Sequence, residues 1–484
     1  MKLVITVDVG ASLTKIIYRL WKNSKEWQQG QICMSPLSEK ITHQKLKDYL
    51  DFKGWVGMPS PEDEAYISVD DQYYVVGELA KEFDAEDRTF ERKYENALYK
   101  VLAAIAVVLE TNQIKNKKQI PIWVSVLLPW EEYNDRKRFT TQLLKYLGNY
   151  KFRGQSVKVK ASQKTIMVMP EGGGIATAYC LKKGAQHLKG KTVGIAMFGH
   201  QNVTGLILKN GKLVAGESPK IGLTWFLDRA IALTSDLNRE KLLKAIVQCL
   251  SELEIDRGTR YKKPDSWIDS PEGKRFQLGL TMRPSYDGNY EGIKSLATAR
   301  SKDLREEEVK DISRAIAKAR SEYFEKIAKW LSKMFPLQET DYLIFSGGAV
   351  LFIKQQLESY CNSYRPIETE KGHKTDIYKY IRLKGVGEYV GFSEPYIELV
   401  SDRDFATVVR ENLEFSDREI EELSLDARFV DGYGIFEFTL GMVTELEQQQ
   451  KAEATKKAKA AKKAAEAVKA SDLSPEEIEL AQAQ

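Results

Sequence analysis

The sequence has few cysteines and little net charge, and both features exclude common classes of protein. Its four cysteines, Cys33, Cys180, Cys249 and Cys361, are too far apart for a CxxC zinc site and do not suggest a disulfide framework. The 73 lysines and arginines are nearly balanced by 69 aspartates and glutamates, which argues against a surface built wholly for nucleic acid. We therefore expect reduced thiols in a cytoplasmic protein that makes no direct contact with nucleic acid.

Long uncharged apolar runs are also absent. The apolar run at the N-terminus is interrupted by Asp8 after the length of one strand. A secretory signal needs a longer run, and a membrane span needs roughly 20 residues. We expect no transmembrane segment. The chain of 484 residues is too long for one compact core, so two or three domains are expected.

Strand-like and helix-like patterns alternate in the first two hundred residues, which predicts an α/β fold. An initial hairpin is expected because two runs rich in valine, isoleucine and tyrosine flank a Gly-Ala-Ser turn. The predicted elements are strands over Leu3–Val9, Thr14–Leu20 and Ile120–Leu128, and helices over Tyr94–Glu110 and Glu131–Leu147.

A second α/β unit is predicted from Val193 onward. Asn210-Gly211 is a strong signal for a two-residue hairpin, because both residues tolerate positive φ. A long charged helix with one apolar face then leads into a strand and Gly347-Gly348. The predicted elements are strands over Val193–Phe198, Val203–Leu208, Lys212–Ala215 and Tyr342–Phe345, and a helix over Asp303–Met334.

The segment from Asp8 to Lys15 combines groups that can hold a phosphate. An acid at a strand end, a glycine, two hydroxyls and a lysine lie within one tight turn. Backbone N–H groups of such a turn can bind phosphate oxygens, Lys15 can neutralise their charge, and Asp8 can hold a hydrated Mg²⁺. An ordinary hairpin with a surface lysine is the alternative.

Glu171 follows an apolar run and precedes three glycines, which predicts a strand that ends at the start of a small-residue helix. An acid there can face a cleft and orient a water for attack on a terminal phosphate. It can equally sit in the first helical turn because the helix dipole favours an acid.

Two further glycine segments follow apolar strands. Gly199 begins a neutral loop in which Gln201, Asn202 and Thr204 offer donors and acceptors, whereas His200 is expected to be structural. Gly347-Gly348-Ala349 lies at a strand-to-helix turn that would let an adenine or ribose approach the backbone.

Taken together and in order, these segments resemble the actin-like ATPases, and most closely the plasmid-partition filament proteins called ParM or StbA. Five segments carry the resemblance: the first phosphate loop at Asp8–Lys15, the catalytic acid at Pro170-Glu171, the second phosphate loop at Val193–Thr204, the adenosine loop at Ser346–Ala349, and the second connecting segment at Asp431–Gly434.

The resemblance implies an actin-like ATPase fold, in which two ribonuclease-H-like duplicated domains surround a nucleotide cleft. It implies ATP as the ligand, with GTP left open, and Mg²⁺ held by Asp8 through water. It assigns catalytic roles to Glu171, Gln201 and Asn202, and nucleotide binding to Asp8, Gly10, Ser12, Thr14, Lys15, Gly199, Gly347, Gly348 and Ala349.

The resemblance also suggests domain boundaries. Residues 1–192 form domain I, to which residues 427–445 return, and residues 193–426 form domain II with an insertion at about 362–425. Residues 446–484 are rich in alanine and lysine and have no apolar stripe, so they are expected to be a disordered or loosely helical tail.

The function implied is that of an ATPase whose filaments segregate plasmid DNA through an adaptor protein. One residue departs from the family, because Met197 stands where its second phosphate loop usually has an aspartate. Methionine is a poor partner for hydrated Mg²⁺, so binding is expected with slow hydrolysis. Two alternatives stay open: a cytoskeletal scaffold filament with weak or no hydrolysis, and a small-molecule kinase of the same superfamily.

Overall fold

The computed structural model describes most of the chain in two compact units, residues 1–436 and residues 437–484. The expected insertion at 362–425 lies almost wholly outside the described residues. These are residues 1–23, 25–53, 59–85, 93–114, 119–234, 237–260, 291–336, 339–350, 352–353, 356–357, 396–399, 412–414, 416 and 425–471.

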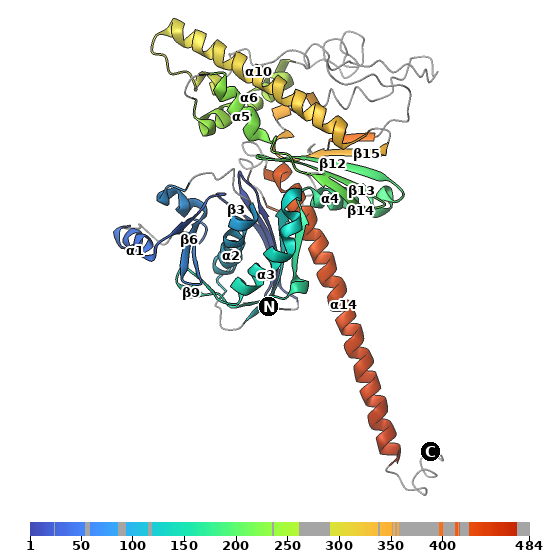
Figure 1. The fold of residues 1–484 in the computed structure, drawn as a ribbon. Helices are drawn as coiled ribbons and strands as arrows, with labels where there is room; N and C mark the ends of the chain where they lie inside the picture. The colour runs from blue at the N-terminus through green and yellow to red at the C-terminus, as the bar shows by residue number, and fades with distance from the viewer. Residues whose placement is uncertain are drawn as a thin grey trace, which may run out of the picture. The chain divides into compact units, whose positions relative to one another are not determined.

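The first sheet begins with the hairpin predicted from the sequence (Figure 1). Strand β1 pairs antiparallel with β2, and β1 and β7 are parallel. Nearly all of β1 is buried, which explains its continuous apolar run. The strands are β1 (Lys2–Val9), β2 (Thr14–Trp21), β3 (Trp27–Met34), β7 (Ile120–Leu128), β10 (Val159–Lys160) and β11 (Ile166–Pro170).

The second sheet repeats the order and directions of the first. In one sheet the order is β3, β2, β1, β7, β11, and in the other it is β14, β13, β12, β15, β16. Each has an antiparallel meander followed by two parallel strands, as expected of a duplicated domain. The strands are β12 (Thr192–Phe198), β13 (Val203–Lys209), β14 (Lys212–Glu217), β15 (Tyr342–Ser346) and β16 (Tyr396–Leu399).

The hairpin between β13 and β14 turns at the predicted dipeptide. Asn210 has φ 53° and Gly211 has φ 72°, the left-handed conformations that a two-residue turn requires.

A third, smaller sheet has the order β4, β6, β5, β8, β9. A separate apolar cluster around Leu46 and Val75 joins it to helix α1 and the 3₁₀ helix η1. The elements are β4 (Ser38–Ile41), β5 (Tyr66–Val69), β6 (Gln72–Val76), β8 (Tyr150–Phe152), β9 (Gln155–Ser156), α1 (His43–Phe52) and η1 (Gly77–Phe83).

Helices complete the two main cores. Helix α2 contacts β1, β2 and β7, whereas α5, α6 and α10 share one apolar cluster with the second sheet. The helices are α2 (Lys93–Thr111), α3 (Arg136–Leu147), α4 (Gly173–Lys183), α5 (Leu223–Ala232), α6 (Arg239–Arg260), α9 (Glu291–Lys294), α10 (Lys302–Met334) and α14 (Leu425–Ser471), with the 3₁₀ helices η2 (Trp130–Asp135), η3 (Gln163–Thr165) and η4 (Ala185–Leu188).

One predicted helix starts later than expected. The sequence predicts a single helix over Glu131–Leu147, but a 3₁₀ helix covers Trp130–Asp135 and α3 begins only at Arg136. Short 3₁₀ turns are common at the N-termini of α-helices, and this one carries Glu132, whose carboxylate accepts hydrogen bonds from the backbone of α2.

In the unit of residues 437–484, the described residues continue α14 as far as Ser471. Alanine and lysine favour helix, in agreement with this course. The remaining residues of the expected tail, 472–484, lie outside the described part.

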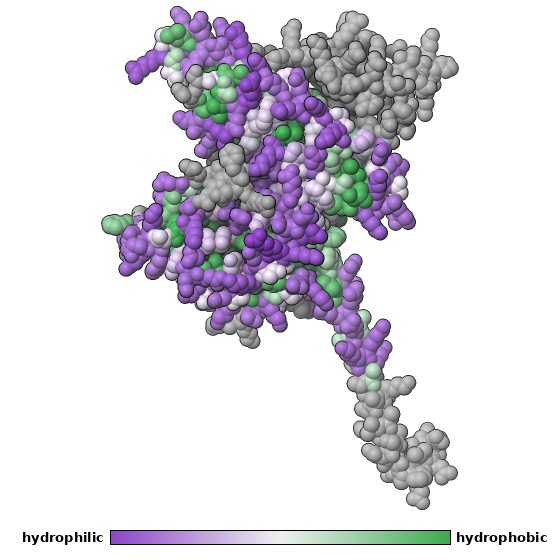
Figure 2. Space-filling model, in the orientation of Figure 1, coloured by the Kyte–Doolittle hydropathy of each residue, from purple (hydrophilic) through white to green (hydrophobic). Residues whose placement is uncertain are grey.

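The surface drawn in Figure 2 is mostly hydrophilic. An apolar area lies over β13 and β14, and Val214 of β14 is 54% exposed. Across the described ranges, no helix combines the length and apolar character that crossing a bilayer requires.

Candidate functional site

The first loop brings Asp8 and Lys15 together. These residues are register partners in the β1–β2 hairpin, and their carboxylate and ammonium groups are 2.5 Å apart. The Lys15 Nζ also donates to the carbonyl of Arg428, at 2.8 Å. Gly10 is required by the turn, since a Cβ there would lie 2.6 Å from the Leu13 carbonyl oxygen.

Two hydroxyls of the first loop differ in their bonding. Ser12 Oγ accepts a hydrogen bond from the Arg428 guanidinium at 3.0 Å. Thr14 Oγ1 is buried and makes no hydrogen bond within the described residues. Buried polar atoms are nearly always satisfied, so the unpartnered hydroxyl of Thr14 is an exception that needs an explanation.

Glu171 comes directly after β11 and is held by both main chain and side chain. Its N–H donates to the Leu128 carbonyl at 2.8 Å, and its buried carboxylate lies 2.6 Å from Lys93 Nζ. Burial raises the pKa of Glu171 above its ordinary value against the opposing effect of Lys93, and nearby Asp8 raises it further.

Lys93 is positioned by an acid from another element. The carboxylate of Glu132 in η2 accepts hydrogen bonds from the N–H groups of Lys93 at 3.0 Å and Tyr94 at 2.8 Å. These are free donors at the start of α2, so Glu132 acts as a remote cap. The cap fixes the position from which Lys93 reaches Glu171.

Asp431 caps the helix that follows Glu171. Its carboxylate accepts from the N–H groups of Gly172 and Gly174, both at 2.7 Å, and of Ile175 at 3.2 Å. Burial, with Asp8 nearby, raises the pKa of Asp431 to about 7, although the N–H donors favour its charged form.

Helices α4 and α14 are in backbone contact at this point. A Cβ on Gly434 would lie 1.9 Å from the Gly174 carbonyl oxygen, and one on Gly174 would lie 1.8 Å from the Asp431 carbonyl oxygen. Only glycine allows such an approach.

The second loop is held against the start of α5. The carbonyl of Gln201 accepts from Gly222 N at 2.9 Å, and that of His200 accepts from Thr224 N at 2.8 Å. Gly199 N donates to the carbonyl of Asn202 at 2.9 Å, which closes the turn. The buried Asn202 Oδ1 has no partner in the part of the chain that the structure describes.

His200 is partly buried in this loop, and its imidazole stays neutral. Burial, together with the nearby positive charge of Arg428, lowers its pKa to about 4. This fits the structural role expected for it.

The third loop lies beside the second. Ala349 N donates to the Phe198 carbonyl at 3.0 Å, and Gly347 has φ 103°. A Cβ on Gly347 would lie 2.4 Å from the same oxygen. Gly348 faces Arg428, because a Cβ on it would lie 3.2 Å from Arg428 Cγ.

The predicted residues therefore form two groups, joined by Arg428. One group comprises Asp8, Gly10, Ser12, Thr14, Lys15 and Glu171, and the other comprises Gly199, Gln201, Asn202, Gly347, Gly348 and Ala349. Met197 is partly buried near the end of β12, opposite Thr204 and Ser346.

Sequence reasoning missed Lys93, Glu132 and Arg428 and gave Asp431 no site role. Lys93 and Glu132 are ordinary charged residues of helices, and no local motif indicates their contacts. Arg428 and Asp431 had a weak signal, since they adjoin or begin the proposed second connecting segment.

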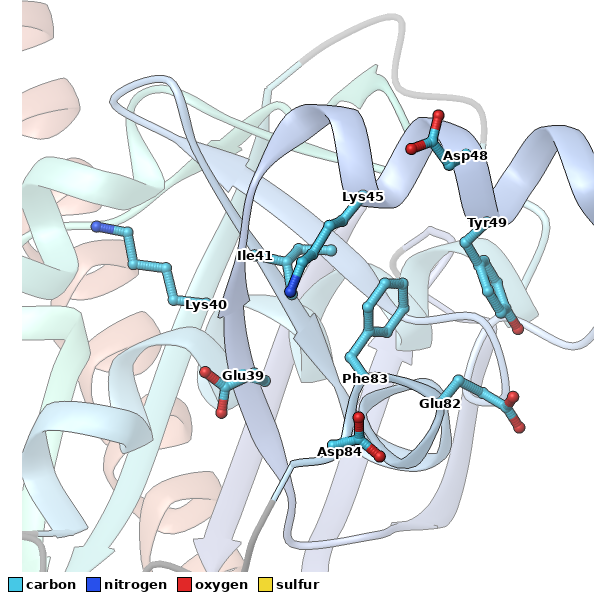
Figure 3. A pocket seen from close by; sticks show the side chains of 9 residues that line it. All are labelled: Glu39, Lys40, Ile41, Lys45, Asp48, Tyr49, Glu82, Phe83 and Asp84. Carbon is cyan, nitrogen blue, oxygen red and sulfur yellow. The ribbon is translucent and has the colours of Figure 1, made fainter.

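A depression elsewhere contains none of the predicted residues. It has a volume of about 600 Å³ and lies among α1, β4 and η1, where Lys45 and Phe83 extend toward one another and Lys40 points away (Figure 3). Its lining, which mixes acids and lysines, does not resemble a mostly apolar ligand pocket.

Comparison with known families identifies the N-terminal part. Residues 6–174 match the family described as "Actin like proteins N terminal domain". This segment is similar to an actin-like N-terminal domain. The match includes Asp8, Lys15 and Glu171, and it confirms the actin-like fold predicted from the sequence.

Several solved structures are similar to this chain at low identity. "Actin-like protein Alp7A" is 14% identical over 93% of this chain and 100% of its own, with a TM-score of 0.48. "Bacillus thuringiensis ParM with ADP" is 14% identical over 92% and 99%, with a TM-score of 0.44. A "15-stranded ParM filament from Clostridium botulinum" is 14% identical over 74% and 91%, with a TM-score of 0.41. No curated protein sequence matches the chain.

Proposed function

We propose that this chain is an actin-like ATP-binding protein that assembles into nucleotide-dependent filaments and segregates plasmid DNA through an adaptor. The observation that carries the nucleotide part is that Thr14 Oγ1 and Asn202 Oδ1 are among the buried side-chain atoms that have no hydrogen-bond partner within the described residues. They lie in two of the glycine loops that the sequence assigns to phosphate binding. Unpaired buried polar atoms are costly, and a polar ligand would satisfy them.

The residues of the first loop fit a nucleotide with its metal ion. Lys15 would neutralise phosphate charge, and Asp8 would hold Mg²⁺ through water. Within the described ranges no three histidine, cysteine or acidic side chains are grouped to hold a metal ion. This accords with a cation that keeps most of its waters and is bound mainly through phosphate. Bound Mg²⁺ would offset charge on the phosphates during their transfer to water.

Glu171 is proposed to orient the attacking water, with Gln201 and Asn202 as further polar groups. The ion pair with Lys93 favours its carboxylate form, while burial favours its acid form. A buried acid with these opposing influences can take up a proton from the attacking water. The nucleotide is proposed as ATP, and GTP remains the alternative.

Closure on the nucleotide is proposed to act at the crossing of α4 and α14. The contact between Gly174 and Gly434 leaves no side chain between the two helices. Glu171 lies three residues before Gly174, and Asp431 lies three residues before Gly434 and accepts hydrogen bonds from Gly172 and Gly174. A movement of Glu171 at the phosphate end of the site would therefore shift the helix crossing directly.

The filament and adaptor roles rest on the match of residues 6–174 to actin-like proteins and on the order of the five motifs. A net charge of +4 suits a filament subunit that leaves DNA binding to another protein. Heterologous contacts that do not close a ring would build the polymer. Its proposed location is the cytoplasm.

Light scattering of the purified protein with ATP, ADP and a non-hydrolysable ATP analogue tests this proposal. We expect scattering that rises with triphosphate and is lost in Lys15→Ala. Lys22→Ala, an exposed lysine just after β2, is the matched control and should assemble normally. No triphosphate-dependent scattering at high protein concentration would favour a monomeric kinase.

Plasmid segregation has its own test. A plasmid that carries the gene with its flanking sequence should be lost faster when it encodes Lys15→Ala than when it encodes Lys22→Ala. Equal loss would contradict segregation and favour the scaffold alternative, which Met197 also supports because it cannot help to hold a hydrated metal ion.

A further inference from the structure

Arg428 occupies a position between the two groups of the site. Its guanidinium donates to Ser12 in the first loop at 3.0 Å, and its carbonyl accepts from Lys15 at 2.8 Å. Its aliphatic stem lies against Gly348 of the third loop. One side chain thus touches both the loop expected to hold phosphate and the loop expected to hold adenosine.

Among the residues that the structure describes, no acidic side chain pairs directly with Arg428. Lys15 pairs with Asp8 at 2.5 Å and Lys93 pairs with Glu171 at 2.6 Å. Within the described residues, Arg428 has only the neutral hydroxyl of Ser12 as a hydrogen-bond acceptor.

An unbalanced guanidinium in this environment is unfavourable. Burial lowers the pKa of Arg428, and the opposing influences of Cys33 and Asp8 do not offset it. A guanidinium carries five N–H donors, of which Ser12 takes one, and its planar fork matches phosphate oxygens. The arrangement therefore has both spare donors and a spare positive charge.

We propose that Arg428 binds the phosphate chain of the nucleotide by donating guanidinium N–H groups to phosphate oxygens. This assignment rests on the proposed function. It predicts that Arg428 distinguishes nucleotides that carry a polyphosphate from adenosine, which has no group for it to bind. Ser12 holds the guanidinium in place and lies on the loop that approaches the same phosphates.

The test measures the affinity of Arg428→Gln for ATP, ADP and adenosine by calorimetry. Loss of a charge-assisted contact should weaken ATP and ADP binding by roughly 10- to 100-fold. The affinity for adenosine should change by less than about twofold, because adenosine has no phosphate for the guanidinium to bind. Arg428→Lys keeps the charge without the fork and should be intermediate. Arg314→Gln, at an exposed arginine of α10, is the matched control and should bind like wild type.

Each other outcome overturns the assignment in a recognisable way. Equal loss of ADP and adenosine affinity would make Arg428 a purely structural contact between loops. Tighter ADP binding by Arg428→Gln would mean that the side chain obstructs the site. If Arg428→Gln does not fold, Arg428→Lys and Ser12→Ala supply the same comparison. Wild-type protein that binds neither ATP nor ADP would overturn the proposed function itself, together with this assignment.

Discussion

The carboxylate of Asp431 accepts a hydrogen bond from the backbone N–H of Gly174, which lies 257 positions earlier in the chain. Gly172, at the N-cap of α4, has no side chain with which to cap the helix, so the distant acid satisfies its free donors. Glu132 does the same for α2 at Lys93. The two helices next to Glu171 therefore depend on tertiary caps, and their stability is coupled to the geometry of the site.

Replacing Asp431 with alanine should be strongly destabilising. It leaves buried N–H donors of Gly172 and Gly174 unsatisfied, which should lower the free energy of unfolding by about 2–4 kcal/mol. Thr42→Ala removes a local cap of α1, where Thr42 Oγ1 accepts from Lys45 N, and should cost only about 1 kcal/mol. Urea unfolding compares the two. A loss in Asp431→Ala no larger than in Thr42→Ala would contradict the remote cap.

The crossing of α4 and α14 should not tolerate one methyl group. In Gly434→Ala the new Cβ would overlap the Gly174 carbonyl oxygen, so the two helices must separate. This separation should lower the free energy of unfolding by about 3 kcal/mol or more. Gly441→Ala is the matched control on the same helix, because no atom of the described residues lies within 4 Å of its Cβ position. It should be neutral or stabilising by up to about 1 kcal/mol. If thermal unfolding gives the same stability for Gly434→Ala and Gly441→Ala, the close contact between α4 and α14 is contradicted.

His200 should make the folded state sensitive to mild acid. The pKa of His200 is about 4 in the folded protein and has its ordinary value of 6.5 in the unfolded chain, so the unfolded chain binds the proton more readily between these two pH values. Its contribution to stability is present above pH 6.5 and is lost as the pH falls toward 4. As the pH falls from 6.5 to 4, the free energy of unfolding of the wild-type protein should decrease by roughly 3 kcal/mol relative to that of His200→Gln.

The comparison of wild type with His200→Gln has to be made at each pH. Asp431 has a raised pKa of about 7, so its contribution to stability is present below the ordinary pKa of 3.8 and is lost as the pH rises through 7. This effect has the opposite sign but is common to both proteins, so it cancels in their difference. A difference that is constant between pH 4 and pH 7.5 would contradict a neutral, buried His200.

The elements that sequence reasoning found are those whose cause is local. The apolar run of β1, the tight turn at Gly10 and the hairpin at Asn210-Gly211 each follow from residues adjacent in the chain. The order of the motifs then led to the actin-like fold. In contrast, the ion pair of Glu171 with Lys93 joins residues 78 positions apart.

Remote contacts leave no local pattern in a single sequence. Nothing in the composition of η2 distinguishes Glu132, which caps another helix, from its exposed neighbour Glu131. The late start of α3 is also hard to predict, because a 3₁₀ turn and the first turn of an α-helix have similar sequences. The site roles of Asp431 and Arg428 likewise become apparent only when α14 meets the first sheet's loops.

Variants of Glu171 and Lys93 should affect different properties, with the first changing hydrolysis and the second changing stability. Glu171→Gln keeps the shape of the side chain but removes the proposed base, so phosphate release should fall by about 10²- to 10⁴-fold while ADP still binds. Phosphate release at the wild-type rate would remove Glu171 from the reaction.

Lys93→Met should act mainly on stability. It leaves the Glu171 carboxylate buried near Asp8 without its cation, which should cost about 3–5 kcal/mol. The double variant Lys93→Met with Glu171→Gln should recover part of this loss, because no uncompensated charge remains. Urea unfolding of the single and double variants measures the coupling, and strictly additive losses would contradict a direct pair.

Met197→Asp should increase phosphate release if the methionine limits hydrolysis. Met197 stands near the end of β12 and is only partly buried, so a carboxylate there can remain hydrated and ionised. It would add a second acid to Asp8 for a water-bound Mg²⁺, which prefers oxygen ligands to a thioether. Met197→Asn has nearly the same shape without the charge and separates the two effects. We expect faster, more Mg²⁺-dependent phosphate release from the aspartate variant alone. If both variants release phosphate at the wild-type rate, the slow step lies elsewhere, and Glu171 with its Lys93 partner becomes the part of the site that sets the rate.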